Sequence, residues 1–296
     1  MFRRFLIGGA AAVVLALGSS AFAAVFAQYV NNSFTQGTLV EYNQQFDDPT
    51  VLGTVLDGPN AVTNAGNPVG VTGLPGYTEY PYQGIVSPFN DPYDVDQVVD
   101  VGIGGSITVK FPQPVNTGTI PSIGVFTSIA LNDSNYGSAI ADDPADTLGD
   151  YVAVVSVSAD GVNWKSLGVQ TFDIPENYYL NAATAYDTDP PADPQVADFG
   201  QPFTGTLASF NGEDYPQILA TLNGSAGGDW LDLTGLGLTQ ISYVQFTEPQ
   251  GVVPDGSYIS LEAVTASDID VPEPVGAAAV LTICALLLPR RRTAAA

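Results

Sequence analysis

The sequence lacks histidine altogether and contains a single cysteine, Cys284, among its 296 residues. Without histidine, Ser-His-Asp and Cys-His nucleophile systems have no base. Because Cys284 lies near the C-terminus, outside the main body of the chain, zinc and copper sites built on imidazole or thiolate are also excluded there. One cysteine cannot form a disulfide within the chain, so an apolar core must stabilise the fold.

Positive charge is equally scarce, with 7 Lys and Arg residues against 31 Asp and Glu residues. All five arginines lie close to the two ends, and only Lys110 and Lys165 fall between residues 24 and 271. That body contains every acidic residue except Glu273, so its formal charge is −28. A field of this sign repels phosphate backbones, which excludes nucleic acid as a partner, and it attracts divalent cations.

The C-terminal segment has three parts in a fixed order. Pro272-Glu273-Pro274 precedes an uncharged stretch, residues 275–288, and the cluster Arg290, Arg291, Arg292 follows it. As a helix, this stretch would be about 21 Å long. A well-matched membrane span needs about 20 residues, which is about 30 Å of helix, so the stretch is short for a stable span. Arginines after it favour the cytoplasmic side, which leaves the body on the far side of the membrane. The pattern indicates a processed tail; the alternative is a plain C-terminal membrane anchor.

These three parts resemble the PEP-CTERM sorting domain of Gram-negative-type bacteria. The resemblance implies that an exosortase-type transpeptidase recognises the chain near Pro272, Glu273 and Pro274. It also implies transient insertion of the tail, with its apolar helix, into the inner membrane. The final destination would then be the cell surface or the extracellular matrix.

The N-terminal segment carries the features of a secretory signal peptide. Arg3-Arg4 is followed by an apolar stretch, residues 5–17, and then by the small-residue pattern Ala21-Phe22-Ala23. Cleavage after Ala23 would leave Ala24 as the first mature residue, and general secretion machinery is the expected partner. The predicted organisation is a signal peptide at 1–23, one domain at 24–266, a linker at 267–271 and the sorting tail at 272–296.

The body between these signals has the periodicity of antiparallel strands. Alternating segments occur at residues 106–111, 152–158, 242–247 and 258–264, and Asp160-Gly161 supplies a turn. In the last segment, Ile259, Leu261 and Ala263 are expected on one face, with Ser260 and Glu262 on the other.

The resulting fold class is all-β, an antiparallel β-sandwich or jelly roll with one short helix and long loops. The helix is expected to be capped by Asp214 and to end at Asn223-Gly224. Long loops are predicted at residues 64–91 and 177–201. An N-terminal signal helix and the C-terminal apolar helix would flank the domain.

Several body motifs look like those of uncharacterised exported bacterial proteins with the same sorting tail. They include residues 46–53, 157–164, 227–233 and 259–264. The hairpin Ser158-x-Asp160-Gly161-x-x-Trp164 also resembles one that recurs in discoidin-like, galactose-binding-like β-sandwiches. The resemblance implies a fold rather than an activity.

Two acidic groups are candidate calcium ligands, because calcium takes six to eight oxygen ligands. One group comprises Asp94 and Asp96, with Asp91 and Asp100 nearby; the other, which we favour, comprises Asp229 and Asp232 after Gly227-Gly228. Neither has the spacing of a twelve-residue helix-loop-helix calcium loop. The alternative is that these side chains shape turns through local hydrogen bonds.

Aromatic residues gather in one Pro- and Gly-rich stretch that contains Tyr77, Tyr80, Tyr82 and Tyr93. Such rings can stack on sugars, which suggests a carbohydrate-binding surface for extracellular polysaccharide. The simpler interpretation is that they pin a long loop to the domain, and Trp164 and Trp230 are expected to be anchors of this kind.

We therefore predict a protein that acts by binding or by structure, and not an enzyme. Paired carboxylates are the one acid–base route that the composition leaves open, so a glycan-cleaving activity is the remaining catalytic alternative.

Overall fold

The computed structural model describes residues 24–39, 46–53, 61–63, 84–118, 123–149, 151–254 and 258–267. Within these residues the protein is predominantly β, with antiparallel sheets and one α-helix, which confirms the predicted class. The predicted flanking helices and the sorting signal lie outside the described residues.

Five strands form the first sheet, called sheet A. They are β1 (Val25–Phe26), β5 (Val99–Gly102), β7 (Ile123–Thr127), β12 (Asp229–Leu231) and β14 (Tyr258–Ala266). The order is β1-β14-β7-β12, and β5 pairs with the first half of β14 on the same side as β1. Every pairing is antiparallel.

Five further strands form sheet B, in the order β11-β10-β13-β6-β2. Their bounds are β2 (Gln28–Tyr29), β6 (Ser106–Asn116), β10 (Tyr151–Ser158), β11 (Trp164–Phe172) and β13 (Gln240–Thr247). The predicted strands at 106–111, 152–158 and 242–247 are therefore confirmed, each within a somewhat longer strand.

The main core lies between the two sheets. It takes Val101, Val125 and Leu261 from sheet A, and Val155 and Phe246 from sheet B, all fully buried. Period-two alternation directs these residues inward, as the sequence predicts. The opposite face of sheet B carries half-buried and exposed side chains along β10 and β11.

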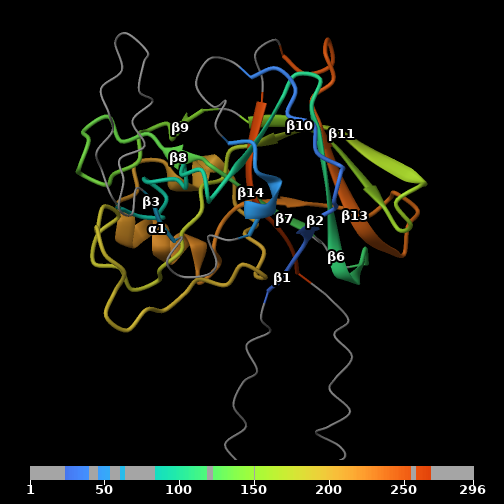
Figure 1. The fold of residues 1–296 in the computed structure, drawn as a ribbon. Coiled ribbons are helices and arrows are strands. Elements are labelled where there is room, and N and C mark those ends of the chain that lie inside the picture. Colours follow the sequence, from blue (N-terminus) through green and yellow to red (C-terminus); the bar gives the residue numbers. More distant parts are fainter. Residues whose placement is uncertain are drawn as a thin grey trace, which may run out of the picture.

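The opposite face of sheet A is covered by a third layer. Residues 173–228, drawn in yellow to orange in Figure 1, pass over this side together with α1 (Tyr215–Leu222). Phe126 of β7 packs there in a cluster with Tyr178 and Phe199, and Trp230 contacts the same cluster. Sheet A is therefore buried on both faces.

This burial corrects the expectation for β14. Ser260 and Glu262 were placed on a polar face, yet their exposed fractions are 2% and 0%. The predicted alternation of side chains between the two faces is correct up to Leu261. The second face is buried because the covering layer packs against it. A register shift between Leu261 and Ala263 then turns Ala263 away from the core between the sheets and into the cluster on the covered face.

The single helix forms where it is predicted. Asp214 caps it by accepting a hydrogen bond from the Gln217 N–H at 3.0 Å, and Gln217 in turn accepts from the Asp214 N–H. Asn223 ends it with a left-handed conformation at φ 50°. Ile218 and Leu222 are buried beneath it.

Short elements complete the described chain. They are η1 (Pro49–Val51), η4 (Leu207–Phe210) and the strand pairs β3 (Val62–Thr63) with β4 (Gly84–Ile85) and β8 (Ala130–Leu131) with β9 (Thr147–Leu148). The predicted loop at 177–201 contains isolated bridges only. None of the helices in the described ranges has the length and apolarity to cross a membrane.

Candidate functional site

The most unusual side chains of the described protein are four carboxyl groups on the covered side of sheet A. This buried acid cluster consists of Asp91, Asp100, Glu176 and Glu262. The exposed fractions of Asp100, Glu176 and Glu262 are 0%, 1% and 0%, whereas Asp91 is half-buried. Buried carboxylates are rare unless they are paired with cations or well hydrogen-bonded.

Asp100 projects from β5 directly opposite Ser260 of β14. Its backbone N–H donates to the Phe46 carbonyl at 2.8 Å, which fixes the strand. Neither carboxyl oxygen has a hydrogen-bond partner of normal geometry, so the nearby Ser260 hydroxyl offsets only part of the cost of burial. Burial accordingly raises the pKa of Asp100 to about 8.

Glu262 lies at the bulge of β14. Its carbonyl accepts a hydrogen bond from the Gly53 N–H at 2.7 Å, so the segment that follows η1 holds the bulge in place. Burial raises the pKa of the Glu262 carboxyl to about 7, and its interaction with Glu176 lowers that pKa in part.

Glu176 reaches the same place from the segment that follows β11. Its backbone bridges to Gly227, which has a φ of +84°. A Cβ atom on Gly227 would collide with the Pro175 carbonyl oxygen, so glycine is required for this close approach. Burial, and then the charge of Glu262, raise the pKa of Glu176 well above its ordinary range.

Asp91 and Tyr151 lie at the edge of this cluster. The Ser128 hydroxyl donates to an Asp91 carboxyl oxygen at 2.6 Å. Burial raises the pKa of Asp91, and burial, the neighbouring Tyr258 and the charges of Asp91 and Asp100 raise the pKa of the Tyr151 hydroxyl. Burial therefore favours the neutral, protonated forms of the carboxyl groups that lie here.

The two lysines of the described chain lie elsewhere. Lys110 and Lys165 are both exposed, and the Lys110 ammonium lies 5.2 Å from the ring centroid of Tyr243 on sheet B.

The favoured calcium residues, Asp229 and Asp232, have separate structural partners. Asp229 accepts hydrogen bonds from the N–H groups of Asp173 and Ile174, both at 3.1 Å. Asp232 is exposed and accepts from the Thr234 N–H at 2.7 Å. The Asp232 contact is of the local, turn-shaping kind, whereas Asp229 joins β12 to the distant segment that follows β11. Calcium at this position stays a prediction.

The other predicted calcium residues, Asp94 and Asp96, lie in different environments. Asp94 is buried beside Gln97, whose side-chain oxygen accepts from the Tyr93 and Asp94 N–H groups, whereas Asp96 is exposed. Across the described ranges, no three or more Asp, Glu, His or Cys side chains converge in a way suited to a metal. Calcium at Asp94 and Asp96 also stays a prediction.

Among the predicted aromatic residues, Tyr93 is half-buried, and its N–H contacts the Gln97 side chain and, at 3.4 Å, the Thr63 hydroxyl oxygen. Tyr77, Tyr80 and Tyr82 lie outside the described residues. Trp230 is an anchor, because its indole N–H donates to the Gly227 carbonyl at 2.9 Å. Trp164 stands edge-on to Tyr243 on the outer face of sheet B, with ring centroids 6.4 Å apart.

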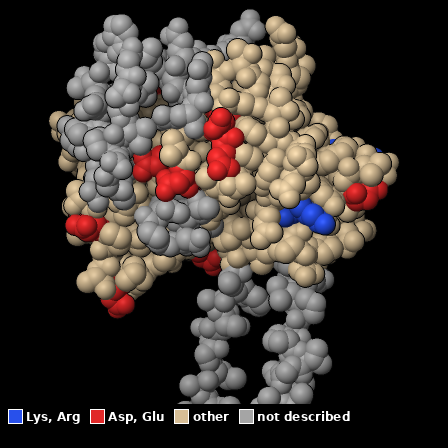
Figure 2. Space-filling model, in the orientation of Figure 1, with Lys and Arg blue, Asp and Glu red and all other residues tan. Residues whose placement is uncertain are grey.

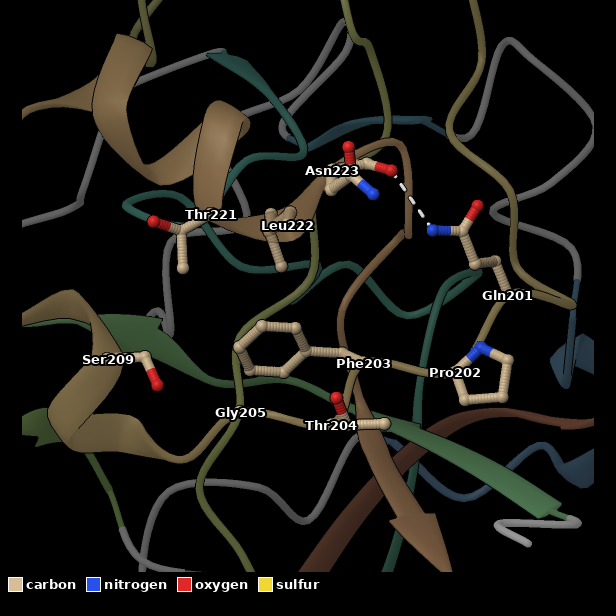
Figure 3. Close-up of a pocket in the computed structure, with 9 residues that line it drawn as sticks. All are labelled: Gln201, Pro202, Phe203, Thr204, Gly205, Ser209, Thr221, Leu222 and Asn223. Atoms are coloured by element: carbon tan, nitrogen blue, oxygen red, sulfur yellow. Dashed lines mark hydrogen bonds between the residues drawn. The ribbon is translucent and has the colours of Figure 1, made fainter.

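A separate pocket of about 340 Å³ opens beside the C-terminal end of α1 (Figure 3). Its lining is Gln201, Pro202, Phe203, Thr204, Gly205, Ser209, Thr221, Leu222 and Asn223. Figure 3 shows the hydrogen bond from the Gln201 side chain to the Asn223 carbonyl, at 3.0 Å, at one end. None of these side chains is ionisable, so the lining offers no group for acid–base chemistry.

No protein-family model and no curated protein matches this chain.

Sequence reasoning identified Asp91 and Asp100 as part of an acidic stretch but missed Glu176 and Glu262. Glu262 was visible only as the polar member of an alternating strand. Glu176 follows Pro175 in a segment without periodicity. Their meeting depends on the path of residues 173–228, which no local pattern encodes.

Proposed function

We propose that this chain is an exported protein, processed at both ends, that works at the surface or in the extracellular matrix of a Gram-negative-type bacterium. It acts by binding or by structure. The observation that carries the proposal is the pair of terminal signals: the signal-peptide pattern ending at Ala23 and the PEP-CTERM-like tail from Pro272 onward. Export machinery and an exosortase-type transpeptidase would be its processing partners.

The limits of the folded domain support this division of the chain. β1 begins at Val25, one residue after the proposed first mature residue, Ala24. β14 ends at Ala266, six residues before Pro272. Removal of both signals therefore leaves every described strand intact.

The charge distribution also supports work outside the cell in contact with ions and polar polymers. Figure 2 shows several groups of acidic side chains on one face, with little basic surface between them. Strong net charge keeps a protein soluble and repels nucleic acids and other polyanions.

A carbohydrate-binding module is the second candidate, and the outer face of sheet B favours it. Trp164 and Tyr243 are both half-exposed, and the Lys110 ammonium and the Gln245 amide lie on the same face. Aromatic rings with polar neighbours on a rigid sheet are suited to sugar recognition. The ligand would be a neutral or weakly acidic extracellular polysaccharide.

A glycan-cleaving enzyme has less support. The adjacent acid pair, Glu176 and Glu262, is buried at exposed fractions of 1% and 0%, where a polymer could not reach it. A glycosidase requires two carboxyl groups on opposite sides of an accessible glycosidic bond.

The test of the proposal is the cellular location of the chain in a host that contains an exosortase-type system. Wild-type protein is expected outside the inner membrane, whereas a variant with Pro272, Glu273 and Pro274 all changed to alanine should accumulate in the membrane fraction. A matched control changes the linker residues Asp268 and Asp270 to asparagine and should behave as wild type. Cytosolic wild-type protein, or identical distribution of the motif variant, would contradict the proposal.

A further inference from the structure

The charged residues of the body are distributed unevenly between the two sheets. The five strands of sheet B contain both lysines of the body, Lys110 and Lys165, and no aspartate or glutamate. Every acidic residue of the body lies outside these strands, and sheet A contains Asp100, Asp229 and Glu262. In Figure 2 the basic atoms lie on the side of the molecule where Figure 1 shows sheet B. Sheet B therefore opposes the approach of a negatively charged group less than the rest of this acidic protein does.

One row of side chains crosses the outer face of sheet B. Residues that pair directly across strands point to the same face of a sheet, and the pairings join one residue of each strand into a row. The row is Gln28, Lys110, Tyr243, Ser158 and Trp164. It faces outward, because the adjacent residues Val109, Val157 and Val244 point into the core. At about 4.8 Å between strands the row is about 19 Å long, so it suits an extended polymer that crosses the strands.

Aromatic contacts position the ammonium group of Lys110 within this row. It lies 5.2 Å from the ring centroid of Tyr243, which is a cation–π contact. The Tyr243 ring is itself held by the turn between β10 and β11, because a Cβ atom on Gly161 would lie only 3.3 Å from it. Trp164 stands edge-on to the same ring. Lys110 is exposed, so its positioned charge is accessible to a group that approaches from solvent.

The two ends of the row differ in charge. Beside Lys110 and Tyr243, the next directly paired residues are the neutral Thr108 and Gln245, and the Gln245 amide donates to the Thr108 hydroxyl at 3.2 Å. At the Trp164 end, the turn between β10 and β11 carries the exposed carboxylate of Asp160. A negatively charged group of a bound polymer is therefore expected at the Lys110 end.

Building on the carbohydrate-binding module, the second candidate function, we propose that the outer face of sheet B binds an extended polysaccharide that is mainly neutral and carries isolated carboxylates, one of which pairs with Lys110. A densely charged polyanion would be repelled by the acidic remainder of the body. A wholly neutral polymer would make no use of the Lys110 charge. A second copy of this chain is a poor occupant of the face, because its body has the same formal charge of −28.

The experiment compares two forms of one ligand, using the protein purified from cells. The probes are oligosaccharides from a glucuronate-containing polysaccharide and the same oligosaccharides after chemical reduction of their carboxyl groups to alcohols. In calorimetric titration, wild-type protein should bind the carboxylated form about 5-fold more tightly, which is the scale of one exposed ion pair. Lys110→Gln should bind both forms equally, with the affinity of wild type for the reduced form.

Lys165→Gln is the matched control, because it removes the same charge from another exposed lysine of sheet B. Lys165 pairs directly with the core residue Val157, so its side chain points to the opposite face from Lys110. This variant should keep the preference for the carboxylated form. The wild-type preference should also weaken between about 0.01 M and 1 M salt, because the Debye length falls from about 30 Å to about 3 Å.

Each other outcome contradicts a different part of the proposal. Equal wild-type binding of both forms would overturn the role of Lys110 and leave the carbohydrate-binding candidate standing, whereas binding of neither form would overturn both. Equal loss of preference in Lys165→Gln would show that net charge, and not this face, is responsible. Sedimentation without polysaccharide should show a monomer; self-association that Lys110→Gln abolishes would make a second copy the occupant. The export proposal is tested separately by cellular location.

Discussion

Val25, the first residue of β1, is the direct antiparallel partner of Ala266, the last residue of β14. The two boundaries of the domain therefore lie side by side at one edge of sheet A, as the ends of β1 and β14 in Figure 1 show. A chain tethered by its tail would thus present the processed N-terminus next to the tether. All the described strands of the domain lie between the two predicted signals.

This position of the strands predicts the effect of shortening the chain. A protein of residues 24–267 should unfold cooperatively, with a free energy of unfolding within about 0.5 kcal/mol of that of residues 24–296. A protein that begins at residue 31 lacks β1 and β2, which exposes the part of the core around Ala27. Its free energy of unfolding should be lower by about 3 kcal/mol or more. Chemical denaturation of the three proteins measures both differences. Loss of folding in the 24–267 protein would show that the signals are part of the fold.

Asp229 allows the predicted calcium site at Asp229 and Asp232 to be tested. Because its carboxylate accepts from the Asp173 and Ile174 N–H groups, Asp229→Ala should destabilise the protein by about 1–3 kcal/mol. Asp229→Asn keeps an acceptor oxygen and should cost much less. If Asp229 binds calcium, calcium should raise the wild-type Tm and the asparagine variant should lose that rise. If Asp229 only shapes the chain, calcium should change the Tm of neither protein.

Glu248 predicts a specific pH dependence of stability. It is fully buried, its N–H donates to the Gly105 carbonyl, and burial raises the pKa of its carboxyl to about 8. Between the unfolded pKa near 4.5 and this value the native state holds a proton that the unfolded state has released. Stability therefore falls as pH rises through this window.

Glu248→Gln removes this proton linkage. Its Tm should match wild type near pH 5 and exceed it near pH 8.5, as thermal melts across this range would show. A variant that loses stability equally at both pH values would mean that Glu248 has a native partner that favours its charged form.

The outer face of sheet B gives a prediction for sugar binding. Tyr243 lies between Trp164 and Lys110, so Tyr243→Ala removes the centre of this surface. If the face binds polysaccharide, the variant should bind about 10-fold more weakly, which corresponds to about 1.4 kcal/mol. Tyr136→Ala, at an exposed tyrosine outside sheet B, is the control. Absence of saturable wild-type binding on a glycan array would favour the structural role.

The sequence predicted the sheets well because each depends on local alternation. Ile107 and Val109 face the core, and Asp214 and Asn223 bound the helix where capping rules place them. Local patterns also anticipated the turn at Asp160, whose carboxylate accepts the Val162 and Asn163 N–H groups, both at 2.8 Å.

Local sequence patterns did not predict the layer that covers sheet A. Residues 173–228 contain little regular structure, so nothing periodic indicates which face they cover. Consequently Glu262 was expected on a polar face, and its neighbour Glu176 was not singled out. Nor does any local pattern show that Gly227 is needed for the close passage of Pro175.

The intact mass of the native protein tests the central claim of export and processing most directly. Mass spectrometry of protein recovered from the cell surface or medium should give a chain that begins at Ala24 and ends near Pro272–Pro274, with or without an attached group. A mass equal to all 296 residues, in protein recovered from the cytosol, would contradict the account.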